Sequence, residues 1–168
     1  CSPFTPRVLS SSGTDTYAAI SAAIGALKGP KHGGANLKVM HQLDYILANV
    51  EHPEDDGEVR EMLRKIIRKE AGDGSGLIYG MGHAVYTLSD PRAQILKNHA
   101  RSLAYKKGYD EEYNMLCSIE RLAPEIFAEE KHGPKKVCAN VDLFSGLIYN
   151  MLGISEDIYT PLFAIARV

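Results

Sequence analysis

The chain has 168 residues, 45% of them hydrophobic and 24% charged, and its formal net charge is −2. This composition is typical of a soluble globular chain with one sizeable core, and it lacks the basic patches that nucleic-acid binding requires. No apolar run approaches the length of a membrane span. Three cysteines without paired spacing argue against a disulfide framework or a metal site and favour a reducing compartment, so we expect a cytoplasmic protein.

Both ends of the chain look cut. It begins at Cys1 rather than Met, and it stops inside the apolar run 161–168. We therefore expect a piece of a longer protein. The first predicted helix, residues 15–28, is rich in small residues that allow a neighbouring helix to approach closely.

The second predicted helix, residues 32–49, follows the Gly- and Pro-rich stretch 29–36 and repeats apolar residues at helical spacing. His32 should lie at its N-terminus, where unpaired N–H groups and the helix dipole disfavour an extra proton. A neutral imidazole there can donate a hydrogen bond to a carbonyl or enolate oxygen. The alternative is a tight turn between helices in which His32 has only a structural role. The residues alone favour that alternative.

A third amphipathic helix is expected at 57–71, followed by a loop over 71–91 that contains too many glycines for a helix. The loop carries His83 but not the phosphate-binding P-loop pattern. A fourth helix is expected at 91–107, with Asp90 as its N-cap and Gly108 at its end. Pro124 should kink or split the next one into pieces at 111–122 and 124–131.

After the turn near residue 134, Asn140 should cap a helix that ends at Gly153 and carries Asp142 in its first turn. The helix dipole keeps a carboxylate there ionised unless burial opposes it. Taken alone, Asp142 is more readily a helix-start acid than a catalytic base. A last helix should begin near 161 and carry Arg167. Since no stretch alternates with period two, the sequence predicts an all-α fold.

His32, His83 and Asp142 each follow a turn and come from separate elements. Two imidazoles and a carboxylate suit proton abstraction next to a carbonyl, with the imidazoles stabilising developing negative charge. Arg92 and Arg167 suit bidentate capture of substrate carboxylates. Their spacing in the sequence does not show that they converge.

Four motifs carry a resemblance to a known family. They are Gly29–Asn36, Gly80-Met81-Gly82-His83-Ala84-Val85-Tyr86 with Asp90-Pro91-Arg92-Ala93, Asn140-Val141-Asp142 with Ser145-Gly146, and Leu162-Phe163-Ala164-Ile165-Ala166-Arg167. In this order they resemble the successive active-site motifs of citrate synthase, and the resemblance covers essentially the whole chain.

The resemblance implies a helical, dimeric enzyme whose large and small domains close over the site. Residues 32–150 would be the small domain, 1–31 a large-domain remnant with its helix, and 151–168 the start of the return into the large domain. The family condenses acetyl-coenzyme A with oxaloacetate to citrate and coenzyme A. The coenzyme A thioester is then a co-substrate, and no permanently bound cofactor is expected.

The resemblance also implies roles for single residues. Asp142 would remove the methyl proton, His32 would stabilise the enol or enolate, and His83 would activate the oxaloacetate carbonyl. Arg92 and Arg167 would hold substrate carboxylates. The loop against the adenine end of coenzyme A would contain Leu77, Ile78, Gly80, Met81 and Gly82.

The chain departs from the family pattern in three ways. In the family, a further oxaloacetate-binding histidine lies upstream of the segment that residues 1–5 resemble. The family pattern also has a further arginine after the segment that ends here at Val168. Because this chain contains neither residue, the piece alone is expected to be inactive. Many family members also have a basic residue at the position of Thr87, so the resemblance does not imply a contact with a coenzyme A phosphate there.

Two alternatives remain for the function. One is 2-methylcitrate synthase, which uses propionyl-coenzyme A and shares these motifs. The other is a non-catalytic binding module. Intact candidate residues argue against that second alternative, because a binding module does not need a general base.

Overall fold

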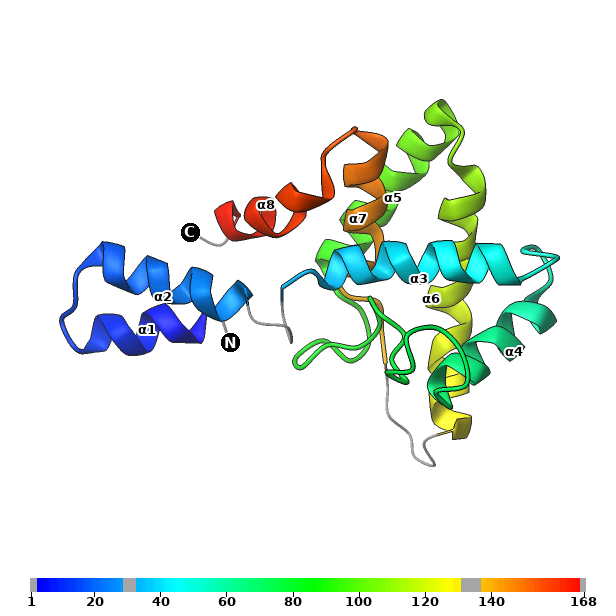
Figure 1. Ribbon diagram of the computed structural model, residues 1–168, viewed down its shortest axis with the longest axis horizontal. Coiled ribbons are helices and arrows are strands. Elements are labelled where there is room, and N and C mark those ends of the chain that lie inside the picture. Colours follow the sequence, from blue (N-terminus) through cyan, green and yellow to red (C-terminus); the bar gives the residue numbers. More distant parts are fainter. Residues whose placement is uncertain (1–2, 29–32, 131–136, 167–168) are drawn as a thin grey trace. The chain divides into compact units, whose positions relative to one another are not determined.

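A computed structural model describes residues 3–28, 33–130 and 137–166, and over these ranges the fold is all-α, as predicted (Figure 1). The helices are α1 (Phe4–Ser11), α2 (Thr16–Lys28), α3 (Ala35–Asn49), α4 (Asp56–Ile67), α5 (Pro91–Lys107), α6 (Asp110–Glu130), α7 (Asp142–Met151), the short 3-10 helix η1 (Glu156–Ile158) and α8 (Tyr159–Ile165). One isolated antiparallel bridge joins Met81 to Ala139. In the described part of the chain, no helix is long and apolar enough to cross a membrane.

The chain divides into two compact units. The first unit is Cys1–Ala35 with Ile154–Val168, and the second unit is Asn36–Gly153. In the first unit α1 packs on α2, and α2 also contacts α8. In the second unit α4 packs on α6, and α5 packs on both α6 and α7. The assignment of residues 32–150 to a small domain stays a prediction.

The start and end of α5 were predicted correctly. The Asp90 carboxylate accepts a hydrogen bond from the Arg92 N–H at 3.0 Å, Pro91 occupies the first helical position, and Gly108 ends the helix in the left-handed conformation with φ 75°. Each of these residues satisfies or replaces a backbone group that the helix end would leave unpaired. Local chemistry alone therefore sets the limits of α5.

The third predicted helix is wrong at its C-terminal end, because α4 stops at Ile67 and not at residue 71. The Lys69 N–H donates to the Ile66 carbonyl at 3.0 Å, and the Glu70 N–H donates to the Lys65 carbonyl at 2.8 Å. These two bonds form a Schellman cap, which needs a left-handed residue after the helix. Lys69 takes that conformation with φ 67°, although it is not a glycine. A lysine gives no sequence signal for such a stop.

The predicted split at Pro124 is also wrong, because α6 is one helix of 21 residues with Pro124 inside it. Proline removes one backbone donor and crowds the preceding turn, which disfavours a continuous helix. Apolar side chains on both sides of Pro124 are nevertheless buried: Leu122, Ala123, Ile126 and Phe127. The burial of this continuous stripe outweighs the lost hydrogen bond.

One further helix and two further helix starts differ from the predictions. The helix α1 was not predicted, since Pro6 and several serines hide it; the proline is tolerated because it lies in the first turn. The helix α3 begins at Ala35 and not at residue 32, and Gly33 and Gly34 form a turn. The helix α8 begins at Tyr159, two residues before the expected start at 161.

The core of the second unit brings the N-terminal halves of α3 and α7 together. At Gly146 of α7, a Cβ atom would lie 2.7 Å from the Asn36 carbonyl oxygen and 2.8 Å from Cγ of Met40 on α3. Such distances are too short for any side chain, so glycine is required where the two helices cross. Phe144 and Leu147 on α7 and Leu43 on α3 are fully buried beside this crossing.

Candidate active site

Two segments far apart in the sequence are joined by the isolated antiparallel bridge between Met81 and Ala139. The Gly82 N–H donates to the Cys138 carbonyl, and the Asn140 N–H donates to the Gly80 carbonyl, both at 2.8 Å. His83 follows the first segment directly, and Asp142 comes two residues after the second. This pairing therefore brings the two predicted site residues to the same part of the second unit.

The side chain of Asn140 holds both segments at once. Its Nδ2 donates to the Gly82 carbonyl at 2.8 Å, and its Oδ1 accepts from the Asp142 N–H at 2.9 Å. The prediction that Asn140 caps this helix is wrong, because the N-cap of α7 is Val141; Asn140 instead bonds the first N–H of α7 from one residue further upstream. Asn140 thus fixes the start of α7 relative to the loop that carries His83.

Gly80 lets the loop lie directly against α7. Its φ is +80°, and a Cβ atom there would lie 2.8 Å from Cα of Leu143. Both the backbone conformation and the contact exclude a side chain. The glycine-rich motif before His83 is thus explained by close packing on the helix that begins with Asp142.

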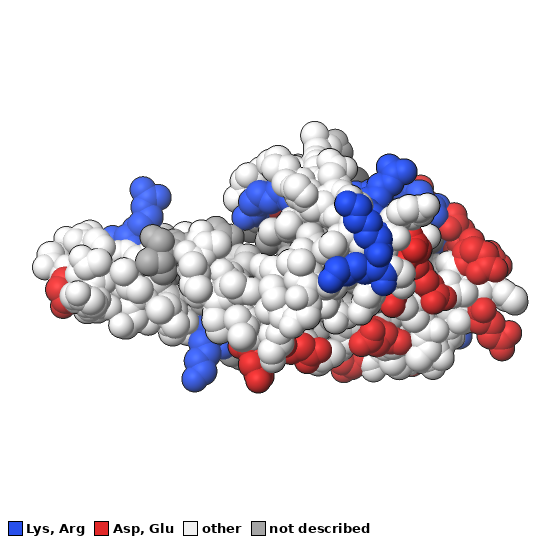
Figure 2. All heavy atoms as spheres, turned by 90° about the horizontal axis from the view of Figure 1, so that it is seen from above, with Lys and Arg blue, Asp and Glu red and all other residues white. Residues whose placement is uncertain are grey.

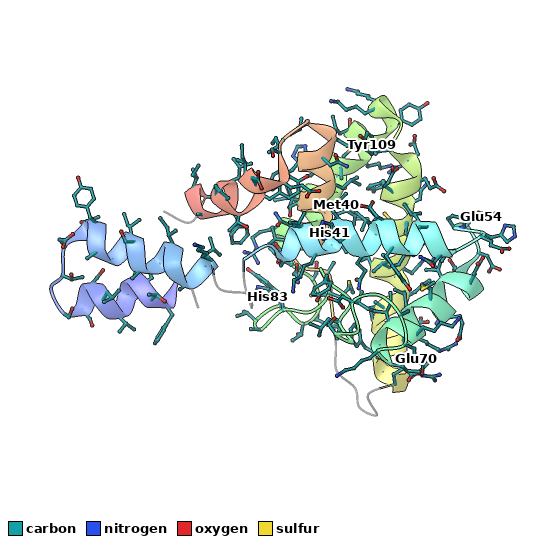
Figure 3. The ribbon with its side chains drawn as sticks, viewed as in Figure 1. Met40, His41, Glu54, Glu70, His83 and Tyr109 are labelled. Carbon is teal, nitrogen blue, oxygen red and sulfur yellow. The ribbon has the colours of Figure 1, made fainter. Side chains whose placement is uncertain are left out.

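The imidazole of His83 has a defined tautomer. Its Nδ1 accepts hydrogen bonds from the N–H groups of Val85 and Tyr86, at 3.0 and 3.1 Å. Nδ1 of a neutral ring that accepts these bonds carries no proton, so the proton is on Nε2. The ring lies on the loop between α4 and α5 (Figure 3), and it presents Nε2–H as a donor.

Arg92 is held by a buried carboxylate. Its Nε donates to Oδ1 of Asp90 at 3.0 Å and its Nη2 donates to Oδ2 at 2.7 Å, while its guanidinium carbon lies 5.6 Å from the centre of the Tyr86 ring. The Asp90 side chain is 0% exposed, and that of Arg92 is 36% exposed. These hydrogen bonds hold the pKa of Asp90 below its ordinary value and raise the pKa of Arg92.

The donors of His83 and Arg92 converge. Nη2 of Arg92 lies 3.3 Å from Nε2 of His83. Because Nε2 carries the proton and a guanidinium has no acceptor, two donors stand side by side without bonding each other. A carbonyl or carboxylate oxygen from a ligand would satisfy both. This pair is therefore suited to bind and polarise an anionic carbonyl compound.

Asp142 lies within electrostatic range of the same pair. Its charge raises the pKa of Arg92 further, after the larger effect of Asp90. Burial raises the pKa of Tyr149, and the charge of Asp142 adds to this rise. His83, Arg92 and Asp142 thus belong to one cluster in the second unit, and their catalytic roles stay predictions.

His32 and Arg167, the other two predicted site residues, lie outside the described residues. Their near neighbours Gly33 and Ile165 both line an apolar hollow of about 860 Å³ in the first unit, together with parts of α2 and α8. Among the described residues, no group of three or more His, Cys, Asp or Glu side chains could hold a metal ion.

The predicted coenzyme A loop has a mixed exposure. Leu77 is 50% exposed, whereas Ile78 is buried at 2%. Gln42, which bonds this loop from α3, was not predicted, and Asp90 was predicted only as a cap. The spacing of Asp90 and Arg92 around a helix start could have indicated their ion pair, but nothing in the sequence singles out Gln42.

Over the described residues the protein is helical, and its histidine–arginine donor pair and helix-start carboxylate are suited to binding an anion. The family profile "Citrate synthase, C-terminal domain" matches residues 1–168. The chain belongs to the citrate synthase family. It is 42% identical over 167 residues to citrate synthase of Synechocystis sp. and 39% identical to that of Deinococcus radiodurans, covering 99% of this chain in both cases. The chain spans 38% and 40% of the length of these relatives.

Solved structures agree with this family. The fold matches a citrate synthase from Thermoplasma acidophilum with a TM-score of 0.77 and 33% identity, over 99% of this chain and 40% of that one. That structure is a ternary complex with carboxymethyl coenzyme A and oxaloacetate. Citrate synthase from Thermotoga maritima matches with a TM-score of 0.73 and 34% identity, over 99% of this chain and 41% of that one.

Proposed function

We propose that this chain forms part of a citrate synthase that condenses acetyl-coenzyme A with oxaloacetate to citrate and coenzyme A. The enzyme would be a cytoplasmic homodimer of the tricarboxylic acid cycle. The chain alone would be inactive, because it spans about two fifths of its relatives. The coenzyme A thioester would be a co-substrate, with no permanently bound cofactor.

The observation that carries the proposal is the donor pair of His83 and Arg92, with Nε2 and Nη2 3.3 Å apart. Oxaloacetate has a ketone next to a carboxylate, so it offers two neighbouring oxygens to these donors. The Nε2–H would hydrogen-bond the ketone oxygen and draw electron density from the carbon that is attacked. Arg92 would hold the carboxylate, with Arg167 as a second partner.

Asp142 would act as the general base. In the proposed step its carboxylate takes a proton from the methyl group of acetyl-coenzyme A, and His32 donates a hydrogen bond to the enolate oxygen that forms. The enolate carbon attacks the ketone carbon of oxaloacetate, whose oxygen takes the charge beside His83. Hydrolysis of the citryl thioester then releases coenzyme A.

The coenzyme A binding loop would be Leu77, Ile78, Gly80, Met81 and Gly82. Its glycines leave the backbone accessible, and the neighbouring Asn140 and Gln42 hold that backbone in place. The adenine end of the co-substrate would lie against these backbone groups. The family resemblance supports this assignment.

The test is a steady-state assay of the full-length enzyme with oxaloacetate and either acetyl- or propionyl-coenzyme A, with release of the free thiol as the readout. We expect acetyl-coenzyme A to give the higher kcat/KM. A preference for propionyl-coenzyme A would make the protein a 2-methylcitrate synthase. Binding of both substrates without any thiol release would instead identify a non-catalytic module.

A further inference from the structure

The side chain of Gln42 on α3 makes two hydrogen bonds to the backbone of the loop before His83. Its Nε2 donates to the Leu77 carbonyl and its Oε1 accepts from the Tyr79 N–H, both at 2.9 Å. Gln42 is only 8% exposed. The amide thus pairs with residues 77 and 79 as a neighbouring strand would, on one edge of the loop.

This pairing fixes the register of the loop. The backbone groups of residues 77 and 79 bond Gln42. The residue between them, Ile78, is buried in the core and is 2% exposed. A slip by one residue would expose Ile78 and bury its neighbours. On the opposite backbone edge, the Ile78 carbonyl accepts from the Met81 N–H at 3.3 Å, so the chain turns directly after these residues.

A second tie lies at the surface. The Tyr79 hydroxyl donates to Oδ2 of Asp73 at 2.6 Å, and the Lys38 ammonium lies 5.1 Å from the centre of the Tyr79 ring. The bonds from Ser75 and then the bond from Tyr79 lower the pKa of Asp73 to about 2. Because this tie is exposed to solvent, it holds the loop less firmly than the buried amide of Gln42.

Without these contacts the loop would sample many conformations. Glycines 72, 74, 76, 80 and 82 all have positive φ, and glycine loses more conformational freedom on ordering than any other residue. A ligand that binds such a backbone has to order it first, which weakens binding. An anchored loop avoids that cost.

We propose that Gln42 is a positioning residue for coenzyme A: its amide holds the backbone of residues 77–79, so that this loop is ordered before the co-substrate binds. The inference rests on the proposed function, which puts the adenine end of coenzyme A on this loop. It assigns to Gln42 an effect on coenzyme A affinity and none on oxaloacetate, whose donors are His83 and Arg92.

The test compares Gln42→Met with the wild-type full-length enzyme by calorimetry. Methionine has a similar length but neither donates nor accepts strongly. Titration with oxaloacetate alone should give an unchanged Kd, within about twofold, and titration with coenzyme A in the presence of oxaloacetate should give a Kd raised by about tenfold, as for the loss of two ordering hydrogen bonds. In kinetics, the KM for acetyl-coenzyme A should rise while kcat stays within about twofold.

Gln94→Met is the matched control, because Gln94 lies on α5 and its side chain bonds only Glu120 among the described residues, at 3.3 Å. It should leave both affinities unchanged. If Gln42→Met does not fold, Gln42→Asn is the second variant: it keeps an uncharged amide, but its side chain is one methylene too short to bond both Leu77 and Tyr79 as Gln42 does. Its Kd for coenzyme A should rise by about threefold, as for the loss of one hydrogen bond.

Three results would overturn the inference: an unchanged Kd for coenzyme A in the Gln42 variants, an equal loss of affinity for both ligands, or a wild-type enzyme that does not bind coenzyme A. If coenzyme A binding depends on Gln42 but the wild-type enzyme releases no thiol from acetyl- or propionyl-coenzyme A, the proposed function fails and the inference stands.

Discussion

The outer face between α4 and α6 and the cluster around Arg92 both depend on arginine–carboxylate pairs, but the pairs differ in burial. Between α4 and α6, Arg64 and Arg68 bond Glu129 and Glu130 at 2.8 Å, and an arginine of α6, Arg121, bonds an acid of α4. Most of these side chains are between about a third and two thirds exposed. In Figure 2, acidic and basic side chains lie close together at the right of the view.

The pair of Asp90 and Arg92 is built differently. The carboxylate is fully buried and caps α5, whereas the arginine is partly exposed and still has donors to offer beside His83. An exposed pair is satisfied by its partner and by water, so it contributes little to stability. A pair with one buried partner holds its arginine in a defined orientation, which suits a binding site. The burial of the partner therefore distinguishes a binding arginine from a surface arginine.

The largest effect is expected within the site cluster, from Asp142→Asn in the full-length enzyme. The substitution keeps size and polarity but removes the basic carboxylate, so turnover should fall by about 100-fold or more. Oxaloacetate affinity should change little. Single-turnover condensation and calorimetry measure the two quantities. Near-normal chemistry, or a loss confined to oxaloacetate binding, would return Asp142 to the role of a helix-start acid.

Arg92→Leu should weaken oxaloacetate binding by roughly 2–5 kcal/mol if the ion pair with the substrate is desolvated. The matched substitution Arg64→Leu on the α4–α6 face removes an arginine of the other kind and should leave this affinity unchanged. Calorimetry on both variants compares the two regions directly. Equal losses of oxaloacetate affinity in the two variants would mean that the burial of the partner carboxylate does not distinguish a binding arginine from a surface arginine.

Asp90→Asn tests whether the buried partner orients Arg92. Oxaloacetate binding should weaken by about tenfold, equivalent to one hydrogen bond to a charged group. The variant should also change acid stability. Because the pKa of Asp90 is lowered in the folded protein, its stabilisation is present above an unfolded pKa of about 3.9 and is lost as the pH falls through the lower folded value.

Unfolding experiments at several pH values measure this loss. Below about pH 3.9 the wild-type enzyme should lose stability more steeply than Asp90→Asn, which has no carboxylate to protonate at this position. The same slope in both proteins would show that the ion pair with Arg92 does not contribute in the folded state.

The smallest effect is expected from Arg64→Leu on folding itself. Exposed pairs contribute little, so the thermal midpoint should change by less than about 2 °C, and even that difference should shrink in high salt. Thermal unfolding at low and high ionic strength is the measurement. A large, salt-independent drop would show that this face stabilises the fold more than its exposure suggests.

The limits of α5 followed from the sequence, because Asp90, Pro91 and Gly108 act on backbone groups within one turn of themselves. The end of α4 at Ile67 and the continuity of α6 through Pro124 did not. The local preference of lysine does not predict the end of α4, which the backbone cap at Lys69 decides. The local preference of Pro124 predicts a break, but tertiary packing keeps α6 continuous. The motifs around His83, Arg92 and Asp142 were recognised in the sequence, but not the contacts that join them.

By itself the sequence determined the all-α fold, the family and the identity of the candidate residues, since helical periodicity, helix caps and motif order are local properties of the chain. Only the tertiary structure decided that Asn140 ties the two loops together, that Asp90 holds Arg92, and that Gln42 grips residues 77–79. Two of these contacts join residues more than thirty positions apart, and the third depends on the complete burial of Asp90. The physical reason is that burial and long-range hydrogen bonds exist only once the helices have packed.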